Sequence, residues 1–150
     1  MRTFSALFAA ATLAATNANA TPDDLRSVAG MQSHNRVLLV FAPSLRDAKL
    51  TAQREVMAKA ALDAATRDLL LVQVADEQVI GAHDTAEGLR RRFHAPVPAY
   101  RAMLIGKDGN VALTTEDVLP AARIVSLIDA MPMRREEMRR ARAGEGKSEQ

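Results

Sequence analysis

The chain has 150 residues, 48% of them hydrophobic, and its 20 basic and 18 acidic residues leave a formal net charge of +2. This length favours one compact domain, and the ordinary hydrophobic share argues against wholesale disorder. The absence of cysteine excludes disulfide bonds, dithiol redox chemistry, thiolate nucleophiles and cysteine-ligated zinc from this chain.

The first twenty residues have the layout of a secretory signal peptide. Arg2 provides a positive start, residues 4–15 form a short apolar stretch, and Ala18-Asn19-Ala20 is a small-x-small cleavage site. The apolar stretch is shorter than the ~20 residues that span a bilayer. We therefore expect cleavage near Ala20, a periplasmic or secreted product, and no transmembrane segment in the mature chain.

The basic excess of the mature chain is concentrated at its C-terminal end. From Arg134 onward there are six basic and four acidic residues, so the rest of the mature chain is close to neutral. Nucleic-acid surfaces need a basic face and often stacking aromatic side chains. Because only Phe41, Phe93 and Tyr100 supply aromatic rings after the signal peptide, nucleic acid is not an expected partner.

The first half of the mature chain predicts a strand, a helix and a second strand. Residues 36–41 form a continuous apolar run that is typical of a buried central strand. The Ser44-x-x-Asp47 pattern resembles a capping box and predicts a helix that ends near Arg67. Residues 68–74 form a second apolar run, so we expect a parallel strand pair with a right-handed crossover.

The next segment predicts a short helix and a hairpin. Asp84-x-x-Glu87 is expected to cap a helix that ends before the prolines at positions 96 and 98. Apolar runs over residues 100–105 and 111–114 flank the sequence Lys107-Asp-Gly-Asn110. An Asp-Gly pair in this position is typical of a type I′ turn, which needs positive φ at both residues.

The C-terminal part predicts two helical segments. Pro120 suits the first turn of a last core helix, whose apolar residues recur at helical spacing up to Met131. Pro132 interrupts this pattern, residues 133–143 predict a charged helix, and residues 144–150 a disordered end.

The predicted order is β-α-β-α-β-β-α, which indicates an α/β, thioredoxin-like fold with a four-stranded mixed sheet and flanking helices. We expect a signal peptide over residues 1–20, a thioredoxin-like domain over 21–133, and a basic, partly disordered tail over 134–150.

Several segments of the chain also resemble the DUF4174 family, and Gly106-Lys-Asp-Gly109 and residues 128–135 are the most specific of them. The others are residues 36–43, Gln53, residues 67–69, residues 89–93 and residues 136–138. The resemblance implies an exported thioredoxin-like domain of unassigned function, and it implies no reaction and no catalytic residue.

The chain differs from redox-active thioredoxins in two places. Their cysteines lie in the loop after the first central strand, where this chain has Ser44 and Asp47. Their cis-proline precedes the hairpin strand, where this chain has Arg101, although Pro96 and Pro98 lie close by. Thiol–disulfide exchange needs a thiolate, so we expect none.

Two sets of polar residues near the predicted loop are candidates for ligand binding. Ser44, Arg46 and Asp47 could bind an anion at a helix N-terminus, and the competing interpretation is a helix cap. Gln53 lies one turn from Leu50, toward the apolar face, so its amide must find partners. It could contact a ligand directly or form a structural hydrogen bond that supports the loop.

The arginines of residues 90–92, with Arg101 and Lys107, could form a patch for an anionic ligand. Consecutive helical residues point about 100° apart, so a solvated face is the competing interpretation. His34, His83 and His94, with Asp84, match no compact metal-ligand spacing. We therefore predict no metal and no other cofactor.

The tail is a further interaction candidate. Met131, Met133 and Met138 lie among arginines, which suits adaptable protein contacts or an anionic membrane surface. A self-solvated cap packed on the domain is equally compatible with this pattern.

We therefore expect an exported, cysteine-free thioredoxin-like domain that binds a protein or cell-envelope component. The expected surface comprises the loop of residues 43–47, the hairpin edge around Lys107 and Asp108, and the basic tail. The alternative is a cysteine-free enzyme or anionic-ligand-binding protein that uses the loop after the first strand. The ligand-binding candidates are Ser44, Arg46, Asp47, Gln53, Arg101 and Lys107, and no residue is assigned a catalytic role.

Overall fold

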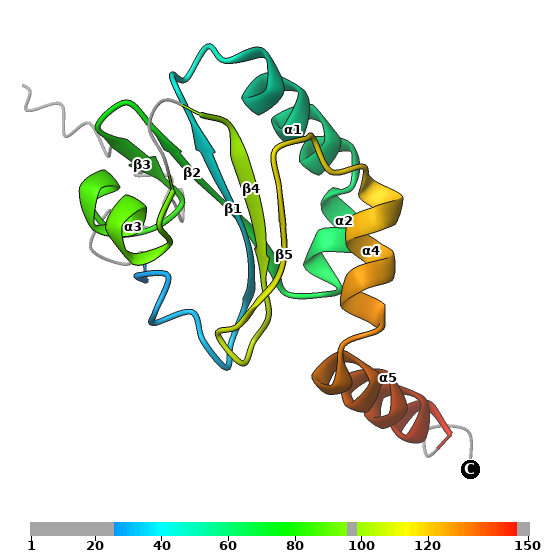
Figure 1. The fold of residues 1–150 in the computed structure, drawn as a ribbon. Coiled ribbons are helices and arrows are strands. Elements are labelled where there is room, and N and C mark those ends of the chain that lie inside the picture. The colour runs from blue at the N-terminus through cyan, green and yellow to red at the C-terminus, as the bar shows by residue number, and fades with distance from the viewer. Residues whose placement is uncertain (1–25, 96–98, 147–150) are drawn as a thin grey trace, which may run out of the picture.

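The computed structural model describes residues 26–95 and 99–146 (Figure 1). The predicted signal peptide and the two prolines at positions 96 and 98 lie outside these ranges. The strands are β1 (Arg36–Ala42), β2 (Leu69–Ala75), β3 (Gln78–Ile80), β4 (Arg101–Ile105) and β5 (Val111–Thr115). The helices are α1 (Ala48–Lys59), α2 (Ala61–Ala65), α3 (Ala86–Arg92), α4 (Ala121–Asp129) and α5 (Pro132–Glu145).

The strands form one mixed sheet in the order β3-β2-β1-β4-β5. β1 and β2 are parallel, as the apolar runs predicted, and the other neighbours are antiparallel. The α/β class and the mixed sheet with flanking helices are confirmed, but the prediction of four strands is wrong. The fifth strand, β3, has only three residues, two exposed and one half-buried, so it leaves no apolar run in the sequence.

Two hydrophobic clusters cover the two faces of the sheet. Odd-numbered residues of β1, such as Leu39, pack with α3 and the segment that precedes β1. Even-numbered residues, such as Val40, pack with Leu50 of α1 and Ile128 of α4. Figure 1 shows α1, α2 and α4 on one side of the sheet and α3 on the other. Burying each such aliphatic side chain contributes about 1.5–3 kcal/mol.

Both predicted helix caps are displaced by one turn or less. Asp47, not Ser44, is the N-cap of α1, because its carboxylate accepts the backbone N–H of Leu50. Thr85, not Asp84, is the N-cap of α3. The Asp84 carboxylate instead accepts the N–H of Val28 at 2.7 Å, and so ties the segment before β1 to the start of α3.

Three other expectations need correction. The predicted helix up to Arg67 is two helices, because Ala60 has ψ 20° and leaves the α-helical conformation. The hairpin turn is not type I′, since only Gly109 has positive φ (82°), while Asp108 uses its carboxylate to accept the N–H of Asn110. α5 extends to Glu145, so residues 144 and 145 are helical rather than part of a disordered end.

The pairing of β1 defines two ends of the sheet. Phe41 faces Arg101 at the end where the loop of residues 43–47 begins, and Val37 faces Ile105 at the other end. The hairpin and α5 lie at this second end (Figure 1). Within the described ranges, no helix is long and apolar enough to cross a membrane.

Candidate functional site

The polar residues of the loop after β1 are engaged in local structure. The Ser44 hydroxyl accepts the N–H of Arg46 at 3.2 Å, and the Asp47 carboxylate accepts the N–H of Leu50 at 3.0 Å. The side chain of Arg46 is exposed. Ser44 and Asp47 therefore stabilise the turn and the start of α1, which is the competing interpretation of the sequence pattern.

Gln53 is fully buried and makes three hydrogen bonds. Its amide nitrogen donates to the carbonyl of Leu119 at 3.0 Å, and its amide oxygen accepts from the Leu119 N–H at 2.8 Å and the Tyr100 hydroxyl at 3.2 Å. Gln53 therefore forms structural hydrogen bonds, which was one of the two interpretations of its position in the sequence. It supports the segment before α4, however, and not the loop of residues 43–47.

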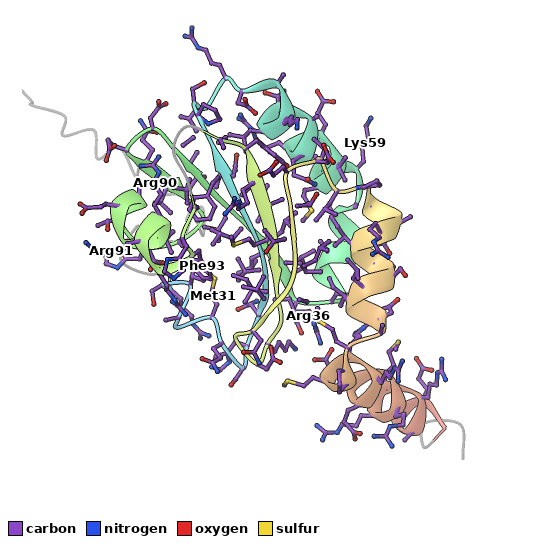
Figure 2. The ribbon with its side chains drawn as sticks, in the orientation of Figure 1. Met31, Arg36, Lys59, Arg90, Arg91 and Phe93 are labelled. Atoms are coloured by element: carbon purple, nitrogen blue, oxygen red, sulfur yellow. The ribbon has the colours of Figure 1, made fainter. Side chains whose placement is uncertain are left out.

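The expected arginine patch is dispersed. Arg90 donates to the carbonyl of Asp76, whereas Arg91 pairs with Glu87 on its own helix at 3.3 Å. Figure 2 shows Arg90 and Arg91 on the side of the molecule away from α5. Arg101 donates to the carbonyl of His94 at 3.2 Å. The residues described contain no group of three or more potential metal ligands.

Lys107, which follows β4, lies at the opposite end of the sheet from Arg101. Its ammonium group is 2.8 Å from the Asp68 carboxylate and 2.7 Å from that of Glu137. The hairpin and the tail therefore meet, as expected, but the loop of residues 43–47 is not part of the same surface. Ser44, Gln53, Arg101 and Lys107 do not converge on one site.

Arg36 is the central residue of this second end. It is the first residue of β1, and its side chain is fully buried. One terminal nitrogen donates to the carbonyl of Arg67 at 2.8 Å, and both terminal nitrogens donate to Glu137, at 3.3 and 3.2 Å. The Nε–H has no acceptor among the described residues.

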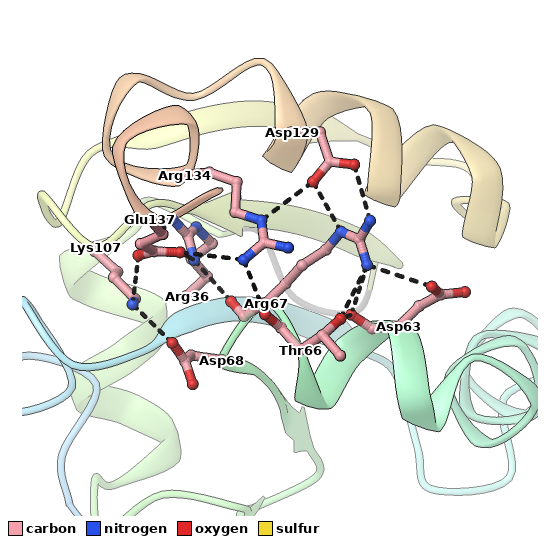
Figure 3. A network of polar contacts seen from close by, with 9 residues as sticks. All are labelled: Arg36, Asp63, Thr66, Arg67, Asp68, Lys107, Asp129, Arg134 and Glu137. Carbon is pink, nitrogen blue, oxygen red and sulfur yellow. Dashed lines mark hydrogen bonds and ion pairs between the residues drawn. The ribbon is translucent and has the colours of Figure 1, made fainter. Parts of the chain in front are cut away.

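A second cluster extends the network along α4 and α2 (Figure 3). The Arg67 guanidinium donates two hydrogen bonds to Asp129, at 3.0 and 2.8 Å. Arg134 donates to Asp129 at 3.3 Å and to the carbonyl of Thr66 at 2.9 Å, and it also lies 3.4 Å from Glu137. α5 contains no buried residue, and these polar contacts join it to β1, to the end of α4 and to the segment before β2.

The charges of this network shift the pKa values of its members. Burial raises the pKa of Glu137, but hydrogen bonds and charges from Lys107 and Arg36 lower it more, so that its pKa lies below the ordinary value. The hydrogen bond from Arg67 is the main cause of a lowered pKa at Asp129. Burial lowers the pKa of Lys107, and its two carboxylate partners raise it above the ordinary value overall. All three groups are therefore charged near neutral pH.

A pocket of about 230 Å³ opens between the hairpin and the start of α5. Its polar wall includes Arg36, Lys107 and Asp108, and its apolar wall is formed by Ala112 and the three residues 131–133. Figure 2 places Arg36 at this end of the sheet, close to α5. The pocket therefore has a largely apolar wall with a few polar groups, which is the usual composition of a small-ligand site.

The exposed side of α5 forms a second and more open depression. It is lined by Pro132, Arg135, Met138, Arg139 and Arg142. Met131 packs against the hydrophobic core, whereas Met133 is 44% exposed. The tail is thus a charged helix whose N-cap, Met131, packs on the domain and whose exposed side carries arginines.

Arg36, Arg67, Asp129 and Glu137 were missed as site residues from the sequence. One signal could have found Arg36, because a cation inside a run expected to be buried on both faces needs a buried partner. Nothing in the sequence indicated that this partner is Glu137, 101 positions away.

The chain matches one family model. Residues 27–137 match the family model described as a domain of unknown function, DUF4174. The search of curated proteins gives no match. The matched range begins within the segment that precedes β1 and ends at Glu137, whose carboxylate accepts hydrogen bonds from Arg36 and Lys107. Since the match covers well over half of the chain, the protein belongs to the DUF4174 family.

Proposed function

We propose that the mature chain is an exported, thioredoxin-like binding module without thiol redox activity. It acts by binding a protein or another cell-envelope component at the pocket between the hairpin and α5. The strand order β2-β1-β4-β5, with one parallel and two antiparallel pairs, supports the thioredoxin-like assignment, and β3 is then an added edge strand. The absence of cysteine supports a role other than thiol exchange.

The pocket is the observation that carries the binding role. α5 has no buried residue of its own, yet Glu137 accepts hydrogen bonds from β1 and from the hairpin. This arrangement holds residues 131–133 over the end of the sheet, where they form one wall of the pocket. A helix that needed only to cover the core would bury apolar side chains, so we infer that this one serves to shape a surface.

The alternative, a cysteine-free enzyme or anionic-ligand-binding protein that uses the loop after β1, has less support. The Ser44 hydroxyl and the Asp47 carboxylate accept backbone hydrogen bonds, and both polar atoms of the Gln53 amide have hydrogen-bond partners. Lys107 lies at the other end of the sheet. The charged groups at the loop therefore do not form a joint site with the remaining candidates.

A substitution that fills the pocket tests the proposal. Ala112 is exposed and lines the pocket, so Ala112→Phe should block it without disturbing the core. Ala122→Phe, at an exposed position of α4, is the matched control. Each full-length chain is expressed, chemically cross-linked in intact cells and purified, and the cross-linked species are identified by mass spectrometry.

We expect the wild type and Ala122→Phe to capture the same envelope component, and Ala112→Phe to lose it while keeping its melting temperature. Equal capture by all three chains, or no cross-linked species with any of them, would contradict the proposal. A sharp loss with Ala122→Phe alone would place the binding surface on α4 instead.

A further inference from the structure

We propose that the exposed side of α5 is a docking surface for an acidic segment of another polypeptide. This surface, the arginine face, consists of Arg135, Arg139 and Arg142 together with Met138. These four residues line the open depression of about 480 Å³ on the helix. Apart from Pro132, the depression shares no lining residue with the pocket of the proposed function, and the inference does not rest on that function.

The three arginines lie on one side of the helix because of their spacing. They occupy positions i, i+4 and i+7, which lie above one another on an α-helix. All three side chains are exposed. Like charges four residues apart repel each other and weaken a helix. The arrangement is therefore unfavourable in the isolated chain, and a partner of negative charge would relieve the repulsion.

The acidic residues of α5 do not neutralise its arginines. The helix has five arginines and three glutamates. Glu137 belongs to the side that contacts the domain, where its carboxylate is shared by three cations, Arg36, Lys107 and Arg134. The remaining charged residues of the helix are two glutamates, at positions 136 and 145, and four arginines, at positions 135, 139, 140 and 142. Four positive and two negative charges leave this part of α5 with a net charge of +2.

Two residues of the arginine face have no counter-ion. Arg139 shares the Glu136 carboxylate with Arg140, whereas Arg135 and Arg142 form no ion pair with any described residue. A guanidinium group binds a carboxylate through two parallel hydrogen bonds. Each of the two unpaired arginines can therefore take a carboxylate from a partner without first losing an ion pair.

The arginine face is also accessible. Figure 1 shows α5 extending away from the sheet toward the C-terminal end. The two residues that join the helix to the domain by ion pairs, Arg134 and Glu137, lie in its first half. The ion pairs of the arginines beyond Glu137 are made with Glu136 of the same helix. A partner can therefore approach this side of α5 without displacing the contacts that hold the helix.

A polypeptide fits the arginine face better than a membrane surface does. Helices that lie in a membrane interface bury a broad apolar side in the lipid, opposite their basic residues. α5 has two large aliphatic residues, Met133 and Met138, and Met138 lies among the arginines instead of opposite them. Methionine side chains adapt to the side chains of a protein partner. At 1.5 Å per residue, the seven residues from Arg135 to Arg142 span about 10 Å, which matches about three residues of an extended chain.

The test is a titration of the purified chain with peptides, followed by NMR signals of the backbone amides. The acidic probe is acetyl-Gly-Glu-Glu-Leu-Glu-Gly-amide, and its neutral control has glutamine in place of each glutamate. Vesicles of phosphatidylcholine and phosphatidylglycerol in equal parts form a third arm, measured by co-sedimentation. The double variant Arg135→Gln/Arg142→Gln removes the two unpaired charges. Arg46→Gln/Lys59→Gln is the matched control, because it removes the same charge from two exposed positions elsewhere.

We expect the acidic peptide to bind and to shift the signals of residues 132–142, and the glutamine peptide to give no shift. Binding should weaken as salt is added, since exposed charges are screened over about 8 Å at physiological ionic strength. Arg135→Gln/Arg142→Gln should bind the acidic peptide at least about threefold more weakly. Arg46→Gln/Lys59→Gln should bind it like the wild type, and so should Ala112→Phe, which blocks only the pocket.

Several results would overturn the proposal. Binding to the vesicles without binding to the acidic peptide would identify a membrane as the partner instead. Equal shifts with the glutamine peptide, equal losses in the two double variants, or no shift with the acidic peptide would each show that the arginine face is not such a site. The shift map of the wild-type chain decides the question even where a variant loses its fold. Failure of the proposed function is recognised separately, because capture in cells is then insensitive to Ala112→Phe.

Discussion

The carboxylate of Glu137, on the last helix, accepts hydrogen bonds from both terminal nitrogens of Arg36, on the first strand, at 3.3 and 3.2 Å. The Arg36 guanidinium is fully buried, whereas the Glu137 side chain is 27% exposed. A buried charge is stable only when it is paired and hydrogen-bonded. The contact therefore supplies the counter-charge of Arg36 and fixes the position of α5.

Replacing Glu137 with glutamine should destabilise the chain more than a surface substitution does. The variant Glu137→Gln keeps the shape of the side chain but removes its charge from Arg36 and Lys107. We expect a loss of about 2–3 kcal/mol in the free energy of unfolding, measured by urea denaturation. Glu136→Gln is the neighbouring control, since its ion-pair partners Arg139 and Arg140 are largely exposed, and it should cost less than about 0.5 kcal/mol. Equal losses in the two variants would show that Arg36 does not depend on Glu137.

The lowered pKa values of Glu137 and Asp129 predict a loss of stability in acid. A carboxyl with a lower pKa in the folded than in the unfolded state stabilises the fold fully above the unfolded pKa of about 4. This contribution decreases as the pH falls through the folded pKa. The urea midpoint should therefore fall between about pH 6 and about pH 3. It should fall less in the double variant Glu137→Gln/Asp129→Asn, and an unchanged pH dependence in that variant would refute the assignment.

Two buried glutamines should respond oppositely to the same substitution. Gln53→Met removes the partner of the Leu119 backbone and of the Tyr100 hydroxyl, at a cost of about 2–4 kcal/mol in the free energy of unfolding. In Gln73, by contrast, the amide oxygen is buried without a partner among the described residues. Gln73→Met should be close to neutral or stabilising. Urea denaturation of both variants measures the difference, and similar losses would count against the structural role of the Gln53 bonds.

The ionisation of Tyr100 should be delayed in the folded state. Burial, with smaller contributions from the charges of Asp47 and Asp117, raises the pKa of its hydroxyl to about 12. The chain has a single tyrosine, so the tyrosinate absorbance reports this group alone. We expect a midpoint near 12 in the folded chain and near 10 in urea. Because the folded state holds this proton more tightly, stability should decrease as the pH rises above about 10. A midpoint near 10 in the folded chain would show that Tyr100 is accessible to water.

The sequence predicted the interior of the sheet well, because its strands are continuous apolar runs. Residues 36–41 and 68–74 agree with β1 and β2 to within one residue at each end. β3 was missed because it pairs through its backbone and has no fully buried side chain. The helix caps were misplaced because Ser44 and Asp47 are both good capping residues, and only the geometry of the loop selects between them.

The site could be predicted only in part. The hairpin pattern identified Lys107, and the composition identified a basic tail, but the other partners of these groups come from three distant segments, with Asp68 before β2, Asp129 at the end of α4 and Arg36 at the start of β1. Asp68 has a positive φ of 51°, and its carboxylate pairs with Lys107 across 39 positions of the chain. Such pairs depend on the register of the sheet and on where α5 lies, neither of which has a local signature.

The attachment of α5 also determines where the chain can be divided. A fragment that ends at Met133, the last residue of the predicted domain, would retain the buried Arg36 but lose Arg134 and Glu137. During synthesis from the N-terminal end, β1 likewise forms long before the carboxylate that neutralises its first residue is present. The smallest fragment that provides Arg36 with its counter-ion extends to Glu137, which is also where the family match ends.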